Sequence, residues 1–310
     1  MAITAAMVKE LREMTGAGMM DCKKALTNTD GDMDAAVEFL RENGLAKAAK
    51  KAGRIAAEGL VAVAVSEDAK EAAIVEVNSE TDFVAKNDTF RTYVAEVADQ
   101  ALTTKAADIE GFLAEESKAE AGKTVKEALD GKIAVIGENL NIRRFAKVSA
   151  ADGFVASYIH AGGKIGVLVV ADTDSDSDAV KECLKNVAMQ IAALNPKYVS
   201  SDDVDADYKE HEKQVLLAQA KNDPKNAGKP DEIIEKMIIG RLNKELKEVC
   251  LLEQPYVKAE NKENVKQYIE AVATAEGCKL NVTKFVRFET GEGLEKKEED
   301  FAAEVAAQLG

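Results

Sequence analysis

The sequence of residues 60–77 reads LVAVAVSEDAKEAAIVEV, and this stretch indicates the fold class. Two apolar runs rich in valine and alanine flank a short polar segment, a pattern that predicts a β-hairpin. A polar turn follows over residues 78–87, and apolar residues then recur at helical spacing over residues 90–97. The predicted unit is therefore strand, strand, helix.

The same order of elements recurs further along the chain. A second hairpin is predicted over residues 154–170, a polar turn over 172–178 and an amphipathic helix over 180–191. We interpret this recurrence as an internal duplication that gives two small α+β subdomains packed side by side. Residues 142–148 predict a further strand that leads into the second subdomain.

Helical patterns flank and interrupt the two subdomains. Apolar residues between positions 7 and 40, broken by glycines and by Asp30-Gly31-Asp32, predict three short helices. The helical period returns over residues 203–249 around a breaker-rich turn at 222–230, which predicts an inserted antiparallel helical hairpin. The tail over residues 298–309 predicts a last amphipathic helix.

The predicted fold class is α+β with a modular organisation. The parts are an N-terminal helical module and linker (1–54), a first core subdomain (55–140), a second core subdomain (141–192 and 257–290), the inserted helical hairpin (193–256) and a C-terminal helical module (291–310). A chain of 310 residues exceeds one average domain, which agrees with this division.

The composition argues against several classes of function. Forty-one lysines and arginines against 56 acidic residues give a formal net charge of −15, which argues against a general nucleic-acid or membrane-surface binder. No run approaches the roughly 20 apolar residues that a membrane span needs. Since the chain has only two histidines, a histidine-rich metal site is excluded.

The N-terminus and the cysteines predict a cytoplasmic location. The first residues lack the basic region and apolar run of a secretory signal. Cys22, Cys183, Cys250 and Cys278 are far apart, and none belongs to a C-x-x-C motif. We expect a reduced, cytosolic protein with structural thiols.

Motifs for covalent chemistry are incomplete. Gly122-Lys123-Thr124 matches the end of a phosphate-binding loop, but Ser117 stands where the first glycine is required. The acidic turn at 172–178 resembles the start of a calcium loop, but Cys183 stands where the bidentate glutamate is required. The sequence offers no constellation of residues for an enzyme, a cofactor or a metal.

An aromatic residue, Phe83, lies within the polar turn after the first hairpin. Either its ring folds back into the local core, or it is a wedge beside Asp82 that is presented to a partner protein. We interpret Tyr158–Gly163 as the matching turn of the second subdomain, where His160 is either a hydrogen-bonded turn residue or a partner contact. An enzyme that uses Asp82 or His160 is a further alternative, and turnover of a small substrate without a protein partner would reveal it.

Several stretches resemble the translation elongation factor Ts family. LREMTGAGMMDCKKAL (11–26) and NSETDFVAK (78–86) are similar to its two signatures. Further matches are Ile136-Gly137-Glu138-Asn139 with Asn141-Ile142-Arg143-Arg144, Ile159-His160 with residues 165–169, and residues 287–289, 291–296 and 300–305. The matches follow the family's order along the whole chain.

The resemblance implies a guanine-nucleotide exchange factor for elongation factor Tu, which promotes GDP release and performs no covalent chemistry. The family's N-terminal helices resemble a ubiquitin-associated domain and dock on the GTPase domain of this partner, GDP-bound or nucleotide-free. A helical insertion mediates self-association in some members, so the inserted hairpin is a candidate dimerisation surface. The alternative is an interaction scaffold that uses the ubiquitin-associated-like module, and a scaffold should tolerate Phe83→Ala.

The resemblance also implies roles for residues in the two turns. Thr81, Asp82, Phe83 and Val84 would enter near the Mg²⁺ site of the partner, where Phe83 would wedge between helices and move the segment that holds Mg²⁺. His160 and its turn would press on another part of the GTPase domain and disturb the phosphate loop.

Docking is assigned to both ends of the chain. By the resemblance, Leu11, Met19 and Met20 would form an apolar docking face with Lys23 beside it. Phe301 of the C-terminal helix would contact the same partner. One departure from the family is Ala161, which follows His160 where the family usually has glycine.

Overall fold

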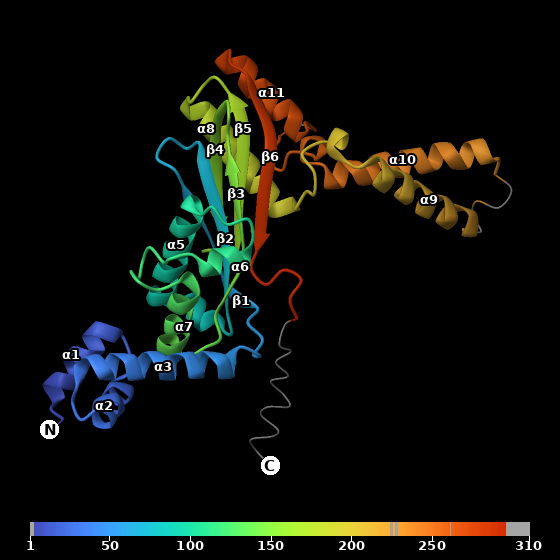
Figure 1. Ribbon diagram of the computed structural model, residues 1–310. Coiled ribbons are helices and arrows are strands. Elements are labelled where there is room, and N and C mark those ends of the chain that lie inside the picture. Colours follow the sequence, from blue (N-terminus) through green and yellow to red (C-terminus); the bar gives the residue numbers. More distant parts are fainter. Residues whose placement is uncertain (1–2, 224–225, 227–228, 261, 296–310) are drawn as a thin grey trace.

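The computed structural model describes residues 3–223, 226, 229–260 and 262–295. This part of the chain is mixed helix and sheet, which confirms the predicted α+β class. An N-terminal group of helices lies at one end of a body that contains two three-stranded sheets, and a pair of helices projects from the body (Figure 1).

The N-terminal module consists of α1 (Ala5–Thr15), α2 (Met19–Asn28) and α3 (Met33–Lys51). The side chains of Thr4 and Asp32 accept hydrogen bonds from backbone amides and so begin α1 and α3. Leu11 and Cys22 are fully buried in the core between the helices. The long helix α3 carries the module to the body, where it packs along α7 (Val125–Ile136).

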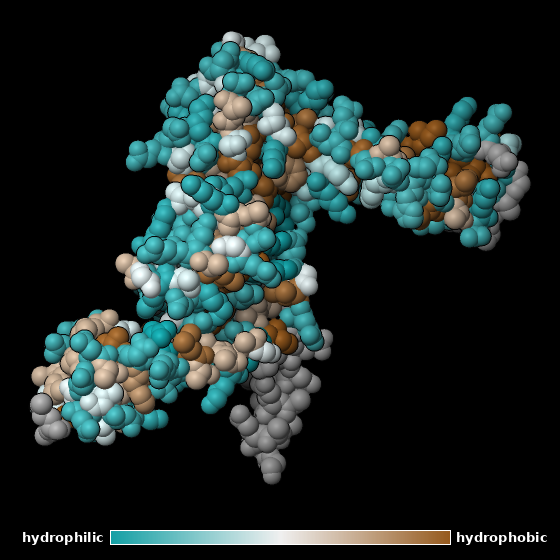
Figure 2. Space-filling view, viewed as in Figure 1, coloured by the Kyte–Doolittle hydropathy of each residue, from teal (hydrophilic) through white to brown (hydrophobic). Residues whose placement is uncertain are grey.

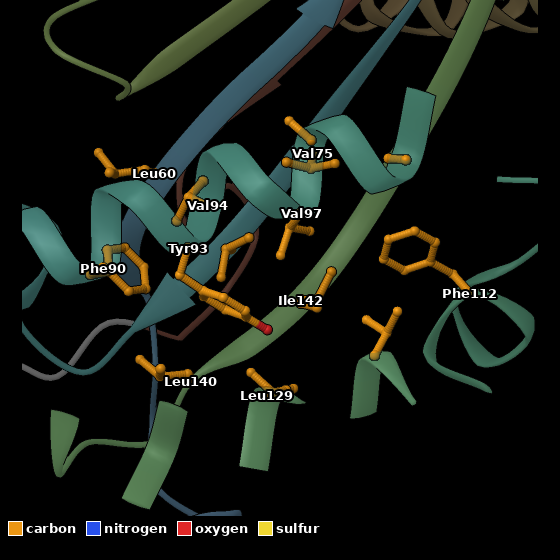
Figure 3. Packing of buried hydrophobic residues seen from close by; sticks show 14 of the residues in the cluster. Leu60, Val75, Phe90, Tyr93, Val94, Val97, Phe112, Leu129, Leu140 and Ile142 are labelled. Carbon is orange, nitrogen blue, oxygen red and sulfur yellow. The ribbon is translucent and has the colours of Figure 1, made fainter. Parts of the chain in front are cut away.

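The first sheet contains β1 (Glu58–Val65), β2 (Glu71–Ser79) and β3 (Asn141–Ser149), in that spatial order and all antiparallel. Helix α5 (Asp88–Thr103) covers one face, and α6 (Ile109–Ala114) and α7 close the core. Figure 3 shows this core, which contains the predicted helical stripe Phe90, Tyr93, Val94 and Val97.

The partner of β3 corrects one predicted boundary. The sequence placed residues 141–149 at the start of the second subdomain, but β3 pairs along its length with β2, from Ser149 opposite Glu71 to Asn141 opposite Asn78. The prediction was wrong because alternation identifies a strand without identifying its neighbour. The first subdomain therefore extends to Ser149.

The second sheet repeats this plan with β4 (Gly153–His160), β5 (Ile165–Thr173) and β6 (Leu280–Glu289). Helix α8 (Asp178–Leu194) packs on β4 and β5, and α11 (Val265–Glu276) takes the place that α7 has in the first half. In each half the third strand follows the helices and pairs with the second strand. The two halves thus share one topology, as the predicted duplication requires.

Each sheet lies between its own helices and the other sheet. In β2, Ala73 and Val75 face the helices, whereas Ile74 belongs to a cluster shared between the sheets. In β5, Val169 faces α8, whereas Leu168 joins Ile74 in the shared cluster. The alternation explains why both central strands are apolar on both faces.

The halves also exchange backbone hydrogen bonds reciprocally. The amide of Val155 in β4 donates to the carbonyl of Ala69 in the first hairpin turn (2.7 Å), and the amide of Val61 in β1 donates to the carbonyl of Gly163 in the second hairpin turn (2.7 Å). Each hairpin turn therefore rests on the first strand of the other half. This arrangement brings the second turn to the end of the first sheet where β2 finishes.

The projecting helices are α9 (Ala206–Asn222) and α10 (Asp231–Val249), flanked by the short 3₁₀ helices η1 (Ser201–Asp203) and η3 (Leu251–Glu253). They pack on each other through Leu216, Ala220, Ile234 and Ile238. Figure 2 shows hydrophobic residues at the surface of this arm, which carries the exposed side chains of Ile233 and Ile239. Both helices lie inside the predicted insertion.

A buried carboxylate joins the first sheet to the end of the described chain. Glu76 in β2 is fully buried and accepts hydrogen bonds from Arg143 Nη1 (3.0 Å), Arg144 Nε (2.6 Å) and the amide of Gly291 (2.8 Å). Burial alone would raise the pKa of Glu76, but the hydrogen bonds from Gly291, Asn78 and Arg143 and the charge of Arg144 outweigh it, so the pKa lies below its ordinary value. The predicted C-terminal helix, with Phe301, lies outside the described residues.

Candidate partner-binding site

The most exposed aromatic side chain of the body is at the end of the first hairpin. Phe83 belongs to the short helix α4 (Asp82–Ala85) and is 79% exposed. Its neighbour Ala85 is buried and Val84 packs partly against the core of the first half. The ring therefore does not fold back into the core, so that alternative is wrong, and the role of Phe83 as a wedge stays a prediction.

Helix α4 begins at a well-formed cap and carries a charge beside the ring. Thr81 Oγ1 accepts a hydrogen bond from the amide of Val84 (3.3 Å). Asp82 pairs with Lys86 (2.6 Å), and Lys86 Nζ lies 5.9 Å from the centroid of the Phe83 ring. The hydrogen bond from Lys86 lowers the pKa of Asp82, and the charge of Lys164 lowers it further. Asp82 is therefore a carboxylate at neutral pH.

His160 lies at the exposed end of β4, where the second hairpin turn begins. Its Nδ1 is 2.9 Å from the hydroxyl of Tyr158. Ala161 adopts a φ of +48°, a left-handed conformation that favours glycine. The turn therefore has the backbone conformation expected for glycine although the residue is alanine. A β-carbon on Gly163 would lie 2.7 Å from Leu60 Cδ2, so the turn sits tightly on β1.

The turn of His160 and the turn of Phe83 do not occupy matching places in the two halves. His160 belongs to the turn within a hairpin, which corresponds to residues 66–70, whereas Phe83 follows a hairpin and corresponds to residues 174–177. The predicted match was wrong because it compared polar segments without comparing the strands on either side.

The reciprocal packing of the halves nevertheless brings the two turns to one end of the molecule. Lys164, in the His160 turn, forms an ion pair with Glu58, and Glu58 is paired with Ser79 at the end of β2. The positive charge of Lys164 contributes to the lowered pKa of Asp82. The second hairpin turn thus lies at the end of β2 that leads into α4.

Only some residues of the predicted docking face of the N-terminal module are exposed, and docking itself stays a prediction. Met19 is 57% exposed, Met20 is 74% exposed and Lys23 is exposed. Leu11 is fully buried, so the prediction that it forms part of an outer face was wrong. Its side chain lies on the side of α1 that meets α2 and α3, and it supports the module from inside.

The sequence missed a third exposed methionine, Met14, at the end of α1. Its side chain is 59% exposed, and it lines a cleft of about 550 Å³ between the N-terminal module and α7, together with Leu40 and Val135. Met19 and Met20 do not line this cleft.

The described residues offer little for covalent chemistry. Among them no group of three or more histidine, cysteine or acidic side chains is arranged to hold a metal ion. None of their helices is long and apolar enough to cross a membrane. The four cysteines are free, and burial raises the pKa of Cys183 and Cys250 to about 11, so both are protonated thiols.

Comparison with known proteins identifies the family of this chain. The family model described as Elongation factor TS matches residues 80–292, a span that begins just before α4 and includes both turns. The chain belongs to the elongation factor Ts family. Membership of this family implies nucleotide exchange on elongation factor Tu in translation elongation.

Curated members of the elongation factor Ts family match along the full length. Elongation factor Ts of Clostridioides difficile (strain 630) is 58% identical over 307 residues, which cover 99% of each chain. Elongation factor Ts of Trichlorobacter lovleyi is 54% identical over 314 residues, which cover 100% of this chain and 99% of the relative. The similarity thus includes the N-terminal module and the projecting helices.

Proposed function

We propose that this protein binds elongation factor Tu with bound GDP and accelerates GDP release by inserting Phe83 beside the Mg²⁺ and phosphate site. The observation that carries the proposal is the 79% exposure of Phe83 on a helix whose other face is anchored in the core. Moving such a ring from water into an apolar pocket yields roughly 1.5–3 kcal/mol, which is available to distort the partner.

The bound nucleotide gives the wedge its target. GTPases of this type hold the phosphates through backbone amides, a lysine and Mg²⁺. Phe83 would move the segment that holds Mg²⁺, and the carboxylate of Asp82 would place a negative charge at the same contact. Thr81 would fix the start of α4, and Val84 would fix its inner face against the core, so that both hold Phe83 and Asp82 at the contact.

Exchange also requires that the factor leave again. Each contact must be stronger with the nucleotide-free partner than with the nucleotide-bound one, and this coupling is reciprocal, so a returning GTP or GDP expels the factor. His160 would act through the same coupling by pressing its turn on the phosphate loop. Performing this exchange involves no covalent step on this chain.

Docking contacts outside the body supply the remaining affinity. Met19, Met20 and Lys23 would place the N-terminal module on the GTPase domain, and Phe301 would add a contact from the C-terminal segment. The exposed Ile233 and Ile239 on α10 favour self-association of the projecting helices. The proposed setting is the cytoplasm, where translation elongation takes place.

The deciding measurement is release of a fluorescent GDP analogue from purified elongation factor Tu at fixed Mg²⁺. We expect strong acceleration by the wild-type protein and a loss of about 10- to 100-fold in Phe83→Ala, the equivalent of the ring's burial energy. His160→Ala should lose less. Val257→Ala removes a side chain that is 53% exposed on the second half and is the matched control, which should retain full activity.

Two outcomes would contradict the proposal. Unchanged GDP release with Phe83→Ala would refute the wedge. Binding to elongation factor Tu without any acceleration by the wild-type protein would instead support the interaction scaffold that uses the N-terminal module.

A further inference from the structure

A carboxylate from another part of the chain binds the residues that immediately precede the helix that carries Phe83. Glu138 follows the glycine that ends α7 and is half-buried. Its Oε2 accepts hydrogen bonds from the amides of Glu80 (3.1 Å) and Thr81 (3.0 Å), and its Oε1 accepts one from Thr81 Oγ1 (2.6 Å). These donors directly precede the first turn of α4.

The contact is reciprocal. Glu80 Oε1 accepts a hydrogen bond from the amide of Asn139 (2.6 Å) and lies 3.4 Å from Arg54 Nη1. The side-chain amide of Asn139 donates to the carbonyl of Arg54 (2.8 Å). Residues 80–81 and 138–139 are therefore joined by hydrogen bonds in both directions. Arg54, in the linker that follows α3, is bonded to the same two segments.

Helix α4 depends on such outside support. It has four residues, far fewer than the roughly 12–15 that an isolated helix needs to be stable in water. On its inner side, Val84 and Ala85 pack on the core. On its outer side, Phe83 is exposed. The orientation of α4 is therefore fixed both by the packing of Val84 and Ala85 and by the backbone at 80–81, where Glu138 binds.

We propose that Glu138 is a positioning residue for Phe83: it holds α4 in the orientation that the exchange reaction needs, without itself touching the nucleotide site. The inference rests on the proposed function, because it assumes that Phe83 acts on the partner. A presented ring that is already ordered loses less conformational entropy on insertion than a mobile one. Without the carboxylate, that ordering must take place during exchange.

The first test compares Glu138→Gln with a matched carboxylate in the same half. Glu115 also caps a loop, accepting hydrogen bonds from Thr104 Oγ1 (2.8 Å) and the amide of Lys105 (3.1 Å). In GDP-release assays, Glu138→Gln should lower kcat about tenfold and leave KM within about twofold, because the docking surfaces are intact. Glu115→Gln should change neither, and equal losses in both variants would overturn the proposal.

A double variant separates this inference from the proposed function. If Glu138 acts through Phe83, Phe83→Ala with Glu138→Gln should be no slower than Phe83→Ala alone. Multiplicative losses would overturn the positioning role. If Phe83→Ala alone has no effect, the proposed function fails, whereas a strong effect of Phe83→Ala with no effect of Glu138→Gln defeats only this inference.

A spectroscopic measurement reports on position without the partner. The chain has no tryptophan, so Phe83→Trp introduces a single indole at the tip of α4. Adding Glu138→Gln should lower its fluorescence anisotropy, and an unchanged anisotropy would contradict the proposal. If Glu138→Gln does not fold, Glu138→Asp keeps the charge but shortens the side chain by one methylene. It should lower both anisotropy and kcat, and unchanged values would contradict the proposal.

Discussion

The two halves of the body share a framework and differ in two connections. Eight residues (80–87) connect β2 to α5 and form α4 with Phe83, whereas four residues (174–177) connect β5 to α8. Conversely, residues 104–124 connect α5 to α7, whereas residues 195–264 connect α8 to α11 and contain the projecting helices. Each half therefore carries one elaboration that the other lacks.

The shared framework includes side chains as well as topology. Gln100 in α5 accepts from the amide of Lys118 (2.9 Å) and donates to the carbonyl of Glu116 (3.2 Å). Gln190 in α8 accepts from the amide of Val257 (3.0 Å) and donates to the carbonyl of Pro255 (3.0 Å). Equivalent buried amides thus fix equivalent loops, so the features that differ between the halves are the candidates for function.

The sharpest test of this division compares two phenylalanines on the first half. Phe90 is fully buried in the core, and Phe90→Ala should lower the free energy of unfolding by about 3–5 kcal/mol. Phe83→Ala should change it by less than about 0.5 kcal/mol, because the exposed ring leaves no cavity. Denaturant unfolding measures both, and a large destabilisation by Phe83→Ala would show that α4 belongs to the framework.

A second test uses a buried charge that the second half lacks. Glu76 lies beside the β2–β3 irregularity, where β5 has the apolar Val170 beside the β5–β6 irregularity. Glu76→Gln removes the anion that both arginines contact and should cost about 3 kcal/mol at neutral pH.

The pH dependence of that cost identifies its origin. Because the pKa of Glu76 is lowered in the folded protein, its stabilisation is complete above the ordinary value of 4.5 and is lost as the pH falls through the lower folded value. The difference in unfolding free energy between wild type and Glu76→Gln should therefore shrink in acid. A difference that stays constant from pH 7 to pH 3 would show that the charge is not the cause.

A third test asks whether the two framework glutamines are equivalent. Gln100→Leu and Gln190→Leu each leave a loop amide and a carbonyl without their side-chain partner, and each should cost about 1–3 kcal/mol. Thermal unfolding of both variants should show similar losses, and GDP exchange measured below the transition should be unchanged. A loss in only one variant would mean that the halves use the shared position differently.

The sequence predicted where strands and helices occur better than it predicted which elements pack against each other. Both hairpins and the helical stripe at Phe90 are periodic, and period is a local property that a sequence carries directly. The place of β3 in the sheet depends on its pairing with β2, which precedes it in the chain by four helices. No local sequence pattern encodes such a distant pairing. The burial of Leu11 likewise depends on which side of α1 the other helices cover.

The candidate site shows the same limit. Phe83 was recognisable as an aromatic residue in a polar turn, but its exposure follows from the anchoring of Val84 and Ala85. Nothing in the sequence indicated that Glu138 binds residues 80 and 81, beyond the presence of Glu138 in one of the motifs that resemble the family. A carboxylate that binds a turn distant in the chain has no characteristic spacing.

Removing the projecting helices α9 and α10, the largest feature that only one half carries, should have the smallest effect on nucleotide exchange. The chain on either side of α9 and α10 already meets, with the amide of Lys197 donating to the carbonyl of Val249 (2.8 Å), so a short glycine-rich linker in place of residues 205–248 should leave both sheets folded. We expect GDP release per molecule within about twofold of wild type, because α4 and the His160 turn lie on the body. Light scattering should then report a smaller assembly if Ile233 and Ile239 mediate self-association. A large loss of exchange in a folded monomeric variant would mean that the second half's elaboration takes part in catalysing GDP release, and the functional division between the halves would fail.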